Sequence, residues 1–227
     1  MRSAIYATTT MLVLGAFCAT ASAYSLTDTG STSFTSDLAQ PGLISVDSFD
    51  TTKGTLQGIT IELWHAGQAT MRADNDDPFN SAQVQARLIR IWSLTGPDIT
   101  ASGNKTIMSP VQLLGLDDGD GGVFDSSAGD GHDFGYLSYS FAAGTYTPTN
   151  LALYETAGPG TVTFTVTPDT MVNDLNWVGD APDVWQMEVQ DPNLVVSATV
   201  TYTYMPEPAT MGLMLLGALA MRRKRHA

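Results

Sequence analysis

The residues best suited to chemistry in this sequence are the aspartates of one glycine-rich segment, Leu116–Asp125, which reads LDDGDGGVFD. Asp117, Asp118, Asp120 and Asp125 place hard carboxylate oxygens in a segment that glycine allows to bend. Because Ca²⁺ binds oxygen ligands on flexible loops, these four aspartates are the candidate metal ligands.

The spacing of these aspartates does not fit an EF-hand. Counted from Asp118, the fifth position is Gly122, the sixth is Val123 and the twelfth is Gly129. A solvated surface turn is the alternative interpretation, since Asp and Gly are common turn residues. The segment Asp74–Asp77 is a second, weaker acidic cluster. The sequence therefore predicts no obligatory cofactor and leaves Ca²⁺ as a candidate ligand.

Two tryptophans and one histidine are further candidates. Trp177 and Trp185 lie in a stretch rich in Asp, Pro and Gly, where they would form a sugar-stacking platform or pack into the core. His132 lies between Asp130 and Asp133, where it would assist a metal or a proton transfer, or be an exposed loop histidine. Both alternatives stay open for each.

Catalytic motifs are missing from the sequence. There is no G-x-S-x-G nucleophile elbow, no H-E-x-x-H zinc motif and no glycine loop with lysine for phosphate. The single cysteine, Cys18, lies in the N-terminal apolar run, so the body of the chain has no thiol nucleophile and no disulfide. A carboxylate pair for glycoside hydrolysis cannot be recognised from sequence spacing. We therefore predict that the protein is not an enzyme.

The charge distribution excludes one class of partner. The chain has 227 residues and a formal net charge of −13, with 10 basic and 23 acidic residues. Half of the basic residues lie at the extreme ends, and only Glu207 of the acidic residues lies outside the segment 24–205. A body this acidic repels polyanions, so nucleic-acid binding is excluded.

The segment that must position these residues has the pattern of β-strands. Apolar residues alternate in Ile59–Trp64, in Thr161–Val166 and in Val196–Tyr204, while Val84–Trp92 is a longer apolar run for which a short helix is an alternative. Strands of about five to nine residues, with Gly, Asp, Pro and Asn between them, predict an all-β domain. The expected architecture is an antiparallel, jelly-roll-like β-sandwich of about eight to ten strands.

The N-terminal segment 1–23 has the three parts of a secretory signal. Arg2 is the positive region, Met11–Phe17 is the apolar region, and Ala21-Ser22-Ala23 is an A-x-A cleavage site. Cleavage after Ala23 would make Tyr24 the mature N-terminus. The segment is expected to be a signal helix, with a buried N-terminal helix as the alternative.

The C-terminal segment 206–227 combines a proline-bounded glutamate, Pro206-Glu207-Pro208, with the uncharged run Ala209–Met221. The run would rise only about 20 Å as a helix, against a hydrocarbon core of about 30 Å. The basic residues Arg222, Arg223, Lys224 and Arg225 follow it and would stay on the cytoplasmic side. This describes a transient anchor, with a simple membrane anchor as the alternative.

These three parts, in this order, resemble the PEP-CTERM sorting signal of bacteria. The resemblance implies that an exosortase, a membrane-embedded cysteine transpeptidase, cuts near Pro206-Glu207-Pro208 after export. Short segments of the body also resemble the choice-of-anchor E domain, an exported β-domain with no assigned activity. They are Phe49-Asp50, Gly54–Ile61, Asp133–Gly135, Gly158–Val162 and Thr199–Tyr204, while Val172–Gln190 departs from that pattern.

Together these features predict a signal peptide (1–23), an extracellular β-sandwich (24–205) and a sorting signal (206–227). The expected function is that of an exosortase-processed surface or extracellular-matrix protein with a structural or interaction role. The expected partners are the secretion machinery, exosortase and exopolysaccharide, and the membrane is contacted only transiently through the C-terminal helix. The alternative function is a carbohydrate-binding module, with dependence on calcium left open.

Overall fold

The computed structural model describes residues 22–120, 122–127 and 129–207, and in these ranges the chain is all-β. The alternating apolar and polar residues form strands with one buried face, as predicted. The strands are β1 (Tyr24–Phe34), β2 (Gly42–Asp47), β3 (Phe49–Asp50), β4 (Thr55–Asp74), β5 (Ala82–Gly96), β6 (Ile99–Met108), β7 (Gln112–Leu114), β8 (Gly131–Tyr146), β9 (Glu155–Thr156), β10 (Thr161–Val178) and β11 (Gln186–Met205).

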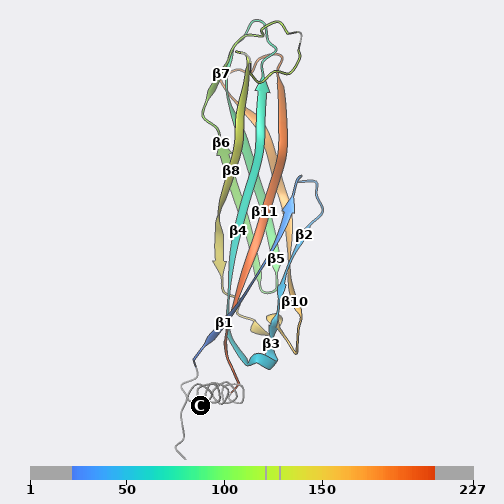
Figure 1. Cartoon of the computed structure of the whole chain (residues 1–227), viewed down its shortest axis with the longest axis vertical. Helices are drawn as coiled ribbons and strands as arrows, with labels where there is room; N and C mark the ends of the chain where they lie inside the picture. Colours follow the sequence, from blue (N-terminus) through green and yellow to red (C-terminus); the bar gives the residue numbers. More distant parts are fainter. Residues whose placement is uncertain (1–21, 121, 128, 208–227) are drawn as a thin grey trace, which may run out of the picture.

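Two antiparallel sheets face each other and form a long sandwich (Figure 1). One sheet has the order β1-β11-β4-β8 and the other has the order β2-β10-β5-β6, with β7 also paired to β5. The short strands β3 and β9 form a separate parallel pair. The run Val84–Trp92 lies inside β5 between β10 and β6, so it is a central strand and not a helix.

The helical segments of the described residues are short. They are the 3₁₀ turns Thr51–Lys53 and Leu151–Tyr154. Across residues 22–207, apart from the two gaps, no helix is long and apolar enough to span a bilayer. The predicted signal helix and C-terminal helix lie outside the described residues.

Several strands are much longer than the sequence predicted. Strands β4 and β11 each have 20 residues and β10 has 18. Residues that resemble turns in the sequence are absorbed as β-bulges, where one strand gains residues against its partner. In β11 the register shifts between Gln190 and Asn193, around Asp191, which has a φ of 50°. A bulge bends a strand without ending it, which the sequence pattern does not reveal.

The two ends of the described chain lie at one pole of the sandwich (Figure 1). Tyr24 at the start of β1 pairs with Tyr204 near the end of β11, and their ring centroids are 6.1 Å apart. Gly54 lies against this end of β11, where an added Cβ would be 2.1 Å from the carbonyl oxygen of Met205. The loops 75–81, 115–130 and 179–185 gather at the opposite pole, which we call the loop pole.

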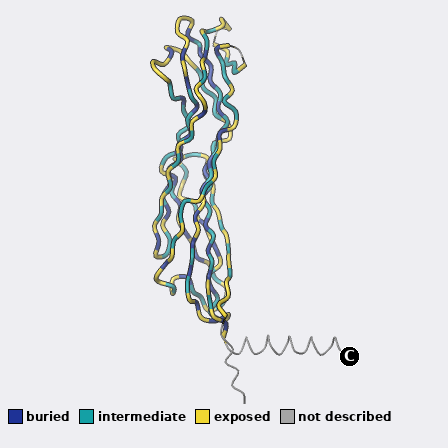
Figure 2. The backbone as a smooth tube through the Cα atoms, turned by 90° about the vertical axis from the view of Figure 1, so that its left-hand side faces the viewer, coloured by how far each residue is buried: buried dark blue, intermediate teal, exposed yellow. Residues whose placement is uncertain are grey.

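Buried residues occur along the whole length of the sandwich (Figure 2). Those that are apolar form two clusters. The larger cluster fills the half that contains the chain ends and includes Phe49, Ile61, Trp92 and Phe164. The smaller cluster fills the half next to the loop pole and includes Met71, Val84, Leu88, Leu114 and Leu175. The sandwich therefore has two cores.

A buried arginine lies where the two cores meet. Arg90 is fully buried on β5, between Leu88 of the smaller cluster and Trp92 of the larger one. Its five N–H groups all donate hydrogen bonds. The acceptors are the carbonyl oxygens of Ile89 (3.0 Å), Val172 (3.0 Å), Gln68 (3.0 Å) and Asn193 (2.8 Å) and Oδ1 of Asn173 (2.8 Å). Burial lowers the pKa of Arg90 to about 10, so the group is charged at neutral pH.

An aromatic cluster surrounds a second buried polar residue near this junction. The His65 ring lies edge-on to the rings of Trp92, Tyr139 and Phe141, with centroids 5.5, 5.2 and 4.2 Å away. Nδ1 of His65 lies 3.3 Å from the Tyr139 hydroxyl. Burial, and to a smaller extent the charge of Lys105, lowers the pKa of His65 to about 4. His65 is therefore neutral in the folded protein at neutral pH.

Replacing Arg90 should destabilise the protein strongly. The substitution Arg90→Met removes the guanidinium donors of four buried-strand carbonyl oxygens, three of them on strands other than β5, and should lower the free energy of unfolding by about 3–5 kcal/mol. Urea denaturation measures this quantity. The control is Arg87→Met on the same strand, which removes a half-buried ion pair with Asp174 and should cost about 1 kcal/mol or less. Equal losses in the two variants would contradict the role given to Arg90.

His65 should make stability fall in mild acid. Its pKa is lower in the folded protein than in the unfolded chain, so the unfolded chain binds more protons between pH 6.5 and about 4. Stability should decrease over this window by about 3 kcal/mol at most. In His65→Phe this component should be absent, while the two proteins should show the same pH dependence above pH 7. Parallel denaturation curves across the acid window would reject the assignment.

Candidate functional site

The loop pole is acidic and has no basic side chain in the three loops that form it. No Lys or Arg occurs in the loops 75–81, 115–130 and 179–185 or within the two residues next to each. The pole contains several aspartates. They are Asp74, Asp76, Asp77, Asp117, Asp118, Asp120, Asp125, Asp130, Asp180 and Asp183. The negative charge of this surface is not balanced by side chains of the same loops.

Asp77 holds the loops of this pole together. Its carboxylate accepts hydrogen bonds from the backbone N–H of Phe79 (2.8 Å), Asn80 (3.1 Å) and Asp183 (2.9 Å) and from the Asn80 amide (3.0 Å). These bonds, those from Asn80 and Asp183 above all, lower the pKa of Asp77 to about 2. Its carbonyl oxygen also accepts the N–H of Asp117. One residue therefore joins the three loops.

Backbone hydrogen bonds then place Asp130 beside the loop that begins at Gly115. The N–H of Gly115 donates to the carbonyl oxygen of Gly129 over 2.9 Å, and the N–H of Asn75 donates to that of Asp130 over 3.2 Å. Asp130 directly precedes β8, and only 4% of its surface is exposed. The chain thus turns a carboxylate inward at the base of an exposed loop.

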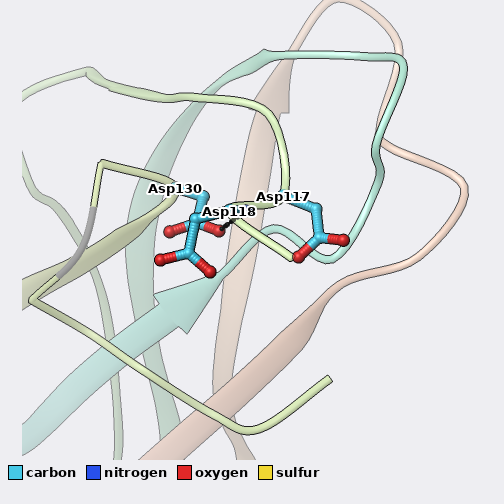
Figure 3. A group of neighbouring side chains, drawn as sticks. All are labelled: Asp117, Asp118 and Asp130. Carbon is cyan, nitrogen blue, oxygen red and sulfur yellow. Dashed lines mark hydrogen bonds between the residues drawn. The ribbon is translucent and has the colours of Figure 1, made fainter. Parts of the chain in front are cut away.

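Three carboxylates meet at this position (Figure 3). Asp117, Asp118 and Asp130 each contribute an oxygen, and these oxygens lie within 4.8 Å of one another. The N–H of Asp118 donates to Oδ2 of Asp130 over 2.8 Å, as the dashed line in Figure 3 shows. The negative charge of Asp130, with burial and other aspartates as smaller causes, raises the pKa of Asp118. We call these three residues the aspartate cluster.

The predicted metal ligands divide between the cluster and its surroundings. Asp117 and Asp118 belong to the cluster, whereas the grouping does not include Asp120 and Asp125. Oδ1 of Asp120 accepts the N–H of Gly122, and Oδ1 of Asp125 accepts the N–H and the hydroxyl of Ser127. Both are part of the local turn structure.

Sequence reasoning did not propose Asp130 as a ligand. It lies twelve residues from Asp118, and the sequence pattern involves it only as a neighbour of His132. The His132 ring packs edge-on against Phe134 with centroids 4.9 Å apart, and Asp133 forms an ion pair with Arg72 at 3.0 Å. The partner of Asp130 is the N–H of Asp118, twelve residues away, so no local sequence signal could have identified it.

The structure brings Trp177 and Trp185 together at the same pole. Their ring centroids are 5.5 Å apart and the planes are inclined by 63°, so the edge of one ring faces the other. Trp185 is 40% exposed. Trp177 is partly buried and packs against the smaller apolar cluster, so it has the core-packing role that the sequence left open. An open hollow at the same pole is lined by residues that include Asn80, Gln83, Asp180 and Asp183, and neither tryptophan lines it.

The predicted processing sites lie at the opposite pole or outside the described residues. Pro206 is buried and Glu207 is exposed where the chain leaves β11. Ala23 is exposed immediately before β1. Ala21, Pro208 and the basic residues Arg222, Arg223, Lys224 and Arg225 lie outside the described residues.

Comparisons with known proteins assign no family to this chain. No protein-family model matches it. No curated protein matches it either. Among solved structures, it is similar to the D431N mutant VP2 protein of infectious bursal disease virus in T=1 particles, at 10% identity and a TM-score of 0.20. A structure of the Gt strain of the same virus gives 11% identity and a TM-score of 0.15. The alignments cover 82% of this chain and 41% of the viral chains, and they carry no argument about function.

Proposed function

We propose that this protein is exported and processed by an exosortase, and that it acts as a structural or interaction module at the cell surface or in the extracellular matrix. The observation that carries the proposal is that the two poles of the sandwich differ. The chain ends lie at one pole and the acidic loops at the other (Figure 1). A tail anchored behind Glu207 would hold the loop pole away from the membrane.

The ends of the sandwich support the same assignment. Strand β1 begins at Tyr24, directly after the expected signal cleavage site, and β11 ends at Met205, directly before Pro206-Glu207. Both junctions are exposed, at Ala23 and at Glu207. Two cleavages at these positions would release a domain in which β1 and β11 keep their full pairing. The resemblance to choice-of-anchor E domains and to the PEP-CTERM signal points to the same processing.

We also infer a jelly-roll topology for the sandwich. The eight longer strands are β1, β2, β4, β5, β6, β8, β10 and β11. Taken in chain order, the first, eighth, third and sixth form one sheet, and the second, seventh, fourth and fifth form the other. This interleaving of two Greek keys supports the inference.

Carbohydrate binding is the second candidate function, and the pair Trp177 and Trp185 favours it. Aromatic rings stack on the apolar faces of sugars, and Trp185 is 40% exposed beside Trp177. Asn80 and Asp180 line a hollow at the same pole and offer groups that hydrogen-bond to hydroxyls. A glycan bound there would lie at the pole farthest from the tail. An exopolysaccharide is the expected partner class.

The tail should be removed in cells that contain an exosortase. The protein recovered from such cells should have an intact mass that lacks residues 1–23 and the residues after the Pro206-Glu207-Pro208 motif. Deleting the exosortase gene, or changing Glu207→Ala, should restore the mass of the C-terminal tail. The matched control is Glu62→Ala, which removes an exposed glutamate from the outer face of β4 and should be processed normally. A native protein that still ends in His226-Ala227 would reject the proposal.

If the tryptophan pair binds glycans, Trp185→Ala should weaken binding about tenfold. Titration of purified exopolysaccharide fragments, with Ca²⁺ and with EDTA, measures the affinity. Trp64→Ala is the control, because Trp64 is comparably exposed but lies on β4, away from the loop pole. Equal affinities of the two variants, or a glycan array without signal in both buffers, would exclude this site.

A further inference from the structure

Asp130 has an unusual environment for a buried carboxylate. Its Oδ2 accepts one hydrogen bond, from the N–H of Asp118. Its Oδ1 is fully buried and has no hydrogen-bond partner among the described residues. Buried charges in proteins are normally paired or bound to metal ions, because removing a carboxylate from water is costly. The described neighbours supply neither a second donor to Oδ1 nor a basic side chain.

The groups around the Asp130 side chain add negative charge and no positive charge. Asp117 and Asp118 bring two further carboxylates to within 4.8 Å. The three loops of the pole contain no Lys or Arg, and the guanidinium of Arg72, on β4, forms ion pairs with Asp133 and Glu188. Three carboxylates therefore gather in one cluster, and the buried member of the cluster has an acceptor without a partner among the described residues. A cation would remove both the repulsion and the unsatisfied acceptor.

We propose that Asp117, Asp118 and Asp130 bind a Ca²⁺ ion. All of the candidate ligand atoms are carboxylate oxygens, which suits a hard cation rather than a transition metal that prefers nitrogen or sulfur. Ca²⁺ fits this irregular loop better than Mg²⁺, because Mg²⁺ requires near-ideal octahedral geometry. Asp130 forms the buried floor and exposed Asp118 forms the entrance. Water molecules and backbone carbonyl oxygens would complete the coordination.

Such an ion would connect two parts of the loop pole that are far apart in the sequence. Asp117 and Asp118 belong to the loop after β7, and Asp130 directly precedes β8. The ion would close the intervening segment and fix its position on β4, through the existing bond from Asn75 to Asp130. The proposal does not rest on the proposed export, since binding is an intrinsic property of the folded chain.

The test uses the protein purified from its expressing cells, treated with EDTA and then dialysed. Isothermal titration with CaCl₂ should show one site with a Kd of about 0.1–1 mM, the range of extracellular calcium modules. At a free Ca²⁺ concentration about ten times Kd, the Tm should rise by about 3–6 °C. MgCl₂ should bind at least about tenfold more weakly. NaCl of equal ionic strength separates specific binding from screening.

Asp130→Asn should weaken Ca²⁺ binding at least about tenfold and abolish the rise in Tm, because affinity depends on the number of charged ligands. The matched control is Asp180→Asn, which removes the same charge from the same pole outside the cluster and should bind Ca²⁺ as the unchanged protein does. Asp118→Asn provides the same test at an exposed position if Asp130→Asn does not fold.

The outcomes divide clearly. One-site binding that is lost in Asp118→Asn or Asp130→Asn and kept in Asp180→Asn supports the site. Equal weakening in all three variants would mean that Ca²⁺ only screens a diffuse negative surface, and that result overturns the proposal. An unchanged Tm with Ca²⁺ also overturns it. None of these results depends on whether the tail is processed.

Discussion

The sandwich depends on one buried guanidinium group, that of Arg90. It lies where the two apolar clusters meet, and its five N–H groups bind oxygens on β4, β5, β10 and β11. Two of these acceptors are the carbonyl oxygens of Gln68 on β4 and Asn193 on β11. These two residues are the first pair of the ladder after the register shift around Asp191. Arg90 supplies donors to carbonyl oxygens next to a break in the ladder, where buried backbone groups need partners. Arg90 thus lets long strands bend at mid-length while both sheets stay joined.

The sequence pattern identified the strands but not their extent. Alternation in Ile59–Trp64, Thr161–Val166 and Val196–Tyr204 predicted the buried faces correctly, because side chains on a strand point to opposite faces in turn. The lengths were wrong because glycine and Asp-Pro pairs look like turns, whereas Gly67 and Asp191 lie inside β4 and β11. Arg90 was not singled out, since the apolar run Val84–Trp92 contains two arginines and the pattern alone gives no reason for one of them to be buried.

The candidate site was predicted in part for a similar reason. Asp117 and Asp118 stand out because they are adjacent in a glycine-rich segment, and local composition is visible in a sequence. Asp130 joins them through the backbone hydrogen bonds between Gly115 and Gly129 and between Asn75 and Asp130. Pairing between such distant segments is not visible in the sequence. The pairing of Trp177 with Trp185 likewise depends on the return of the chain from β10 to β11. Sites built from residues that are distant in the sequence can therefore be recognised only from the three-dimensional structure.

Acidity alone does not distinguish a binding site at the loop pole, but the contrast between Asp77 and Asp130 does. Both aspartates are buried next to loops. The carboxylate of Asp77 accepts four hydrogen bonds, so its charge is satisfied and its role in holding the loops is complete. The carboxylate of Asp130 accepts one, at Oδ2, while its buried Oδ1 has no donor among the described residues and the side chain lies in a cluster with two more carboxylates. The chain therefore stabilises the carboxylate of Asp77 more fully than that of Asp130, and this difference is the reason for placing the proposed cation at Asp130.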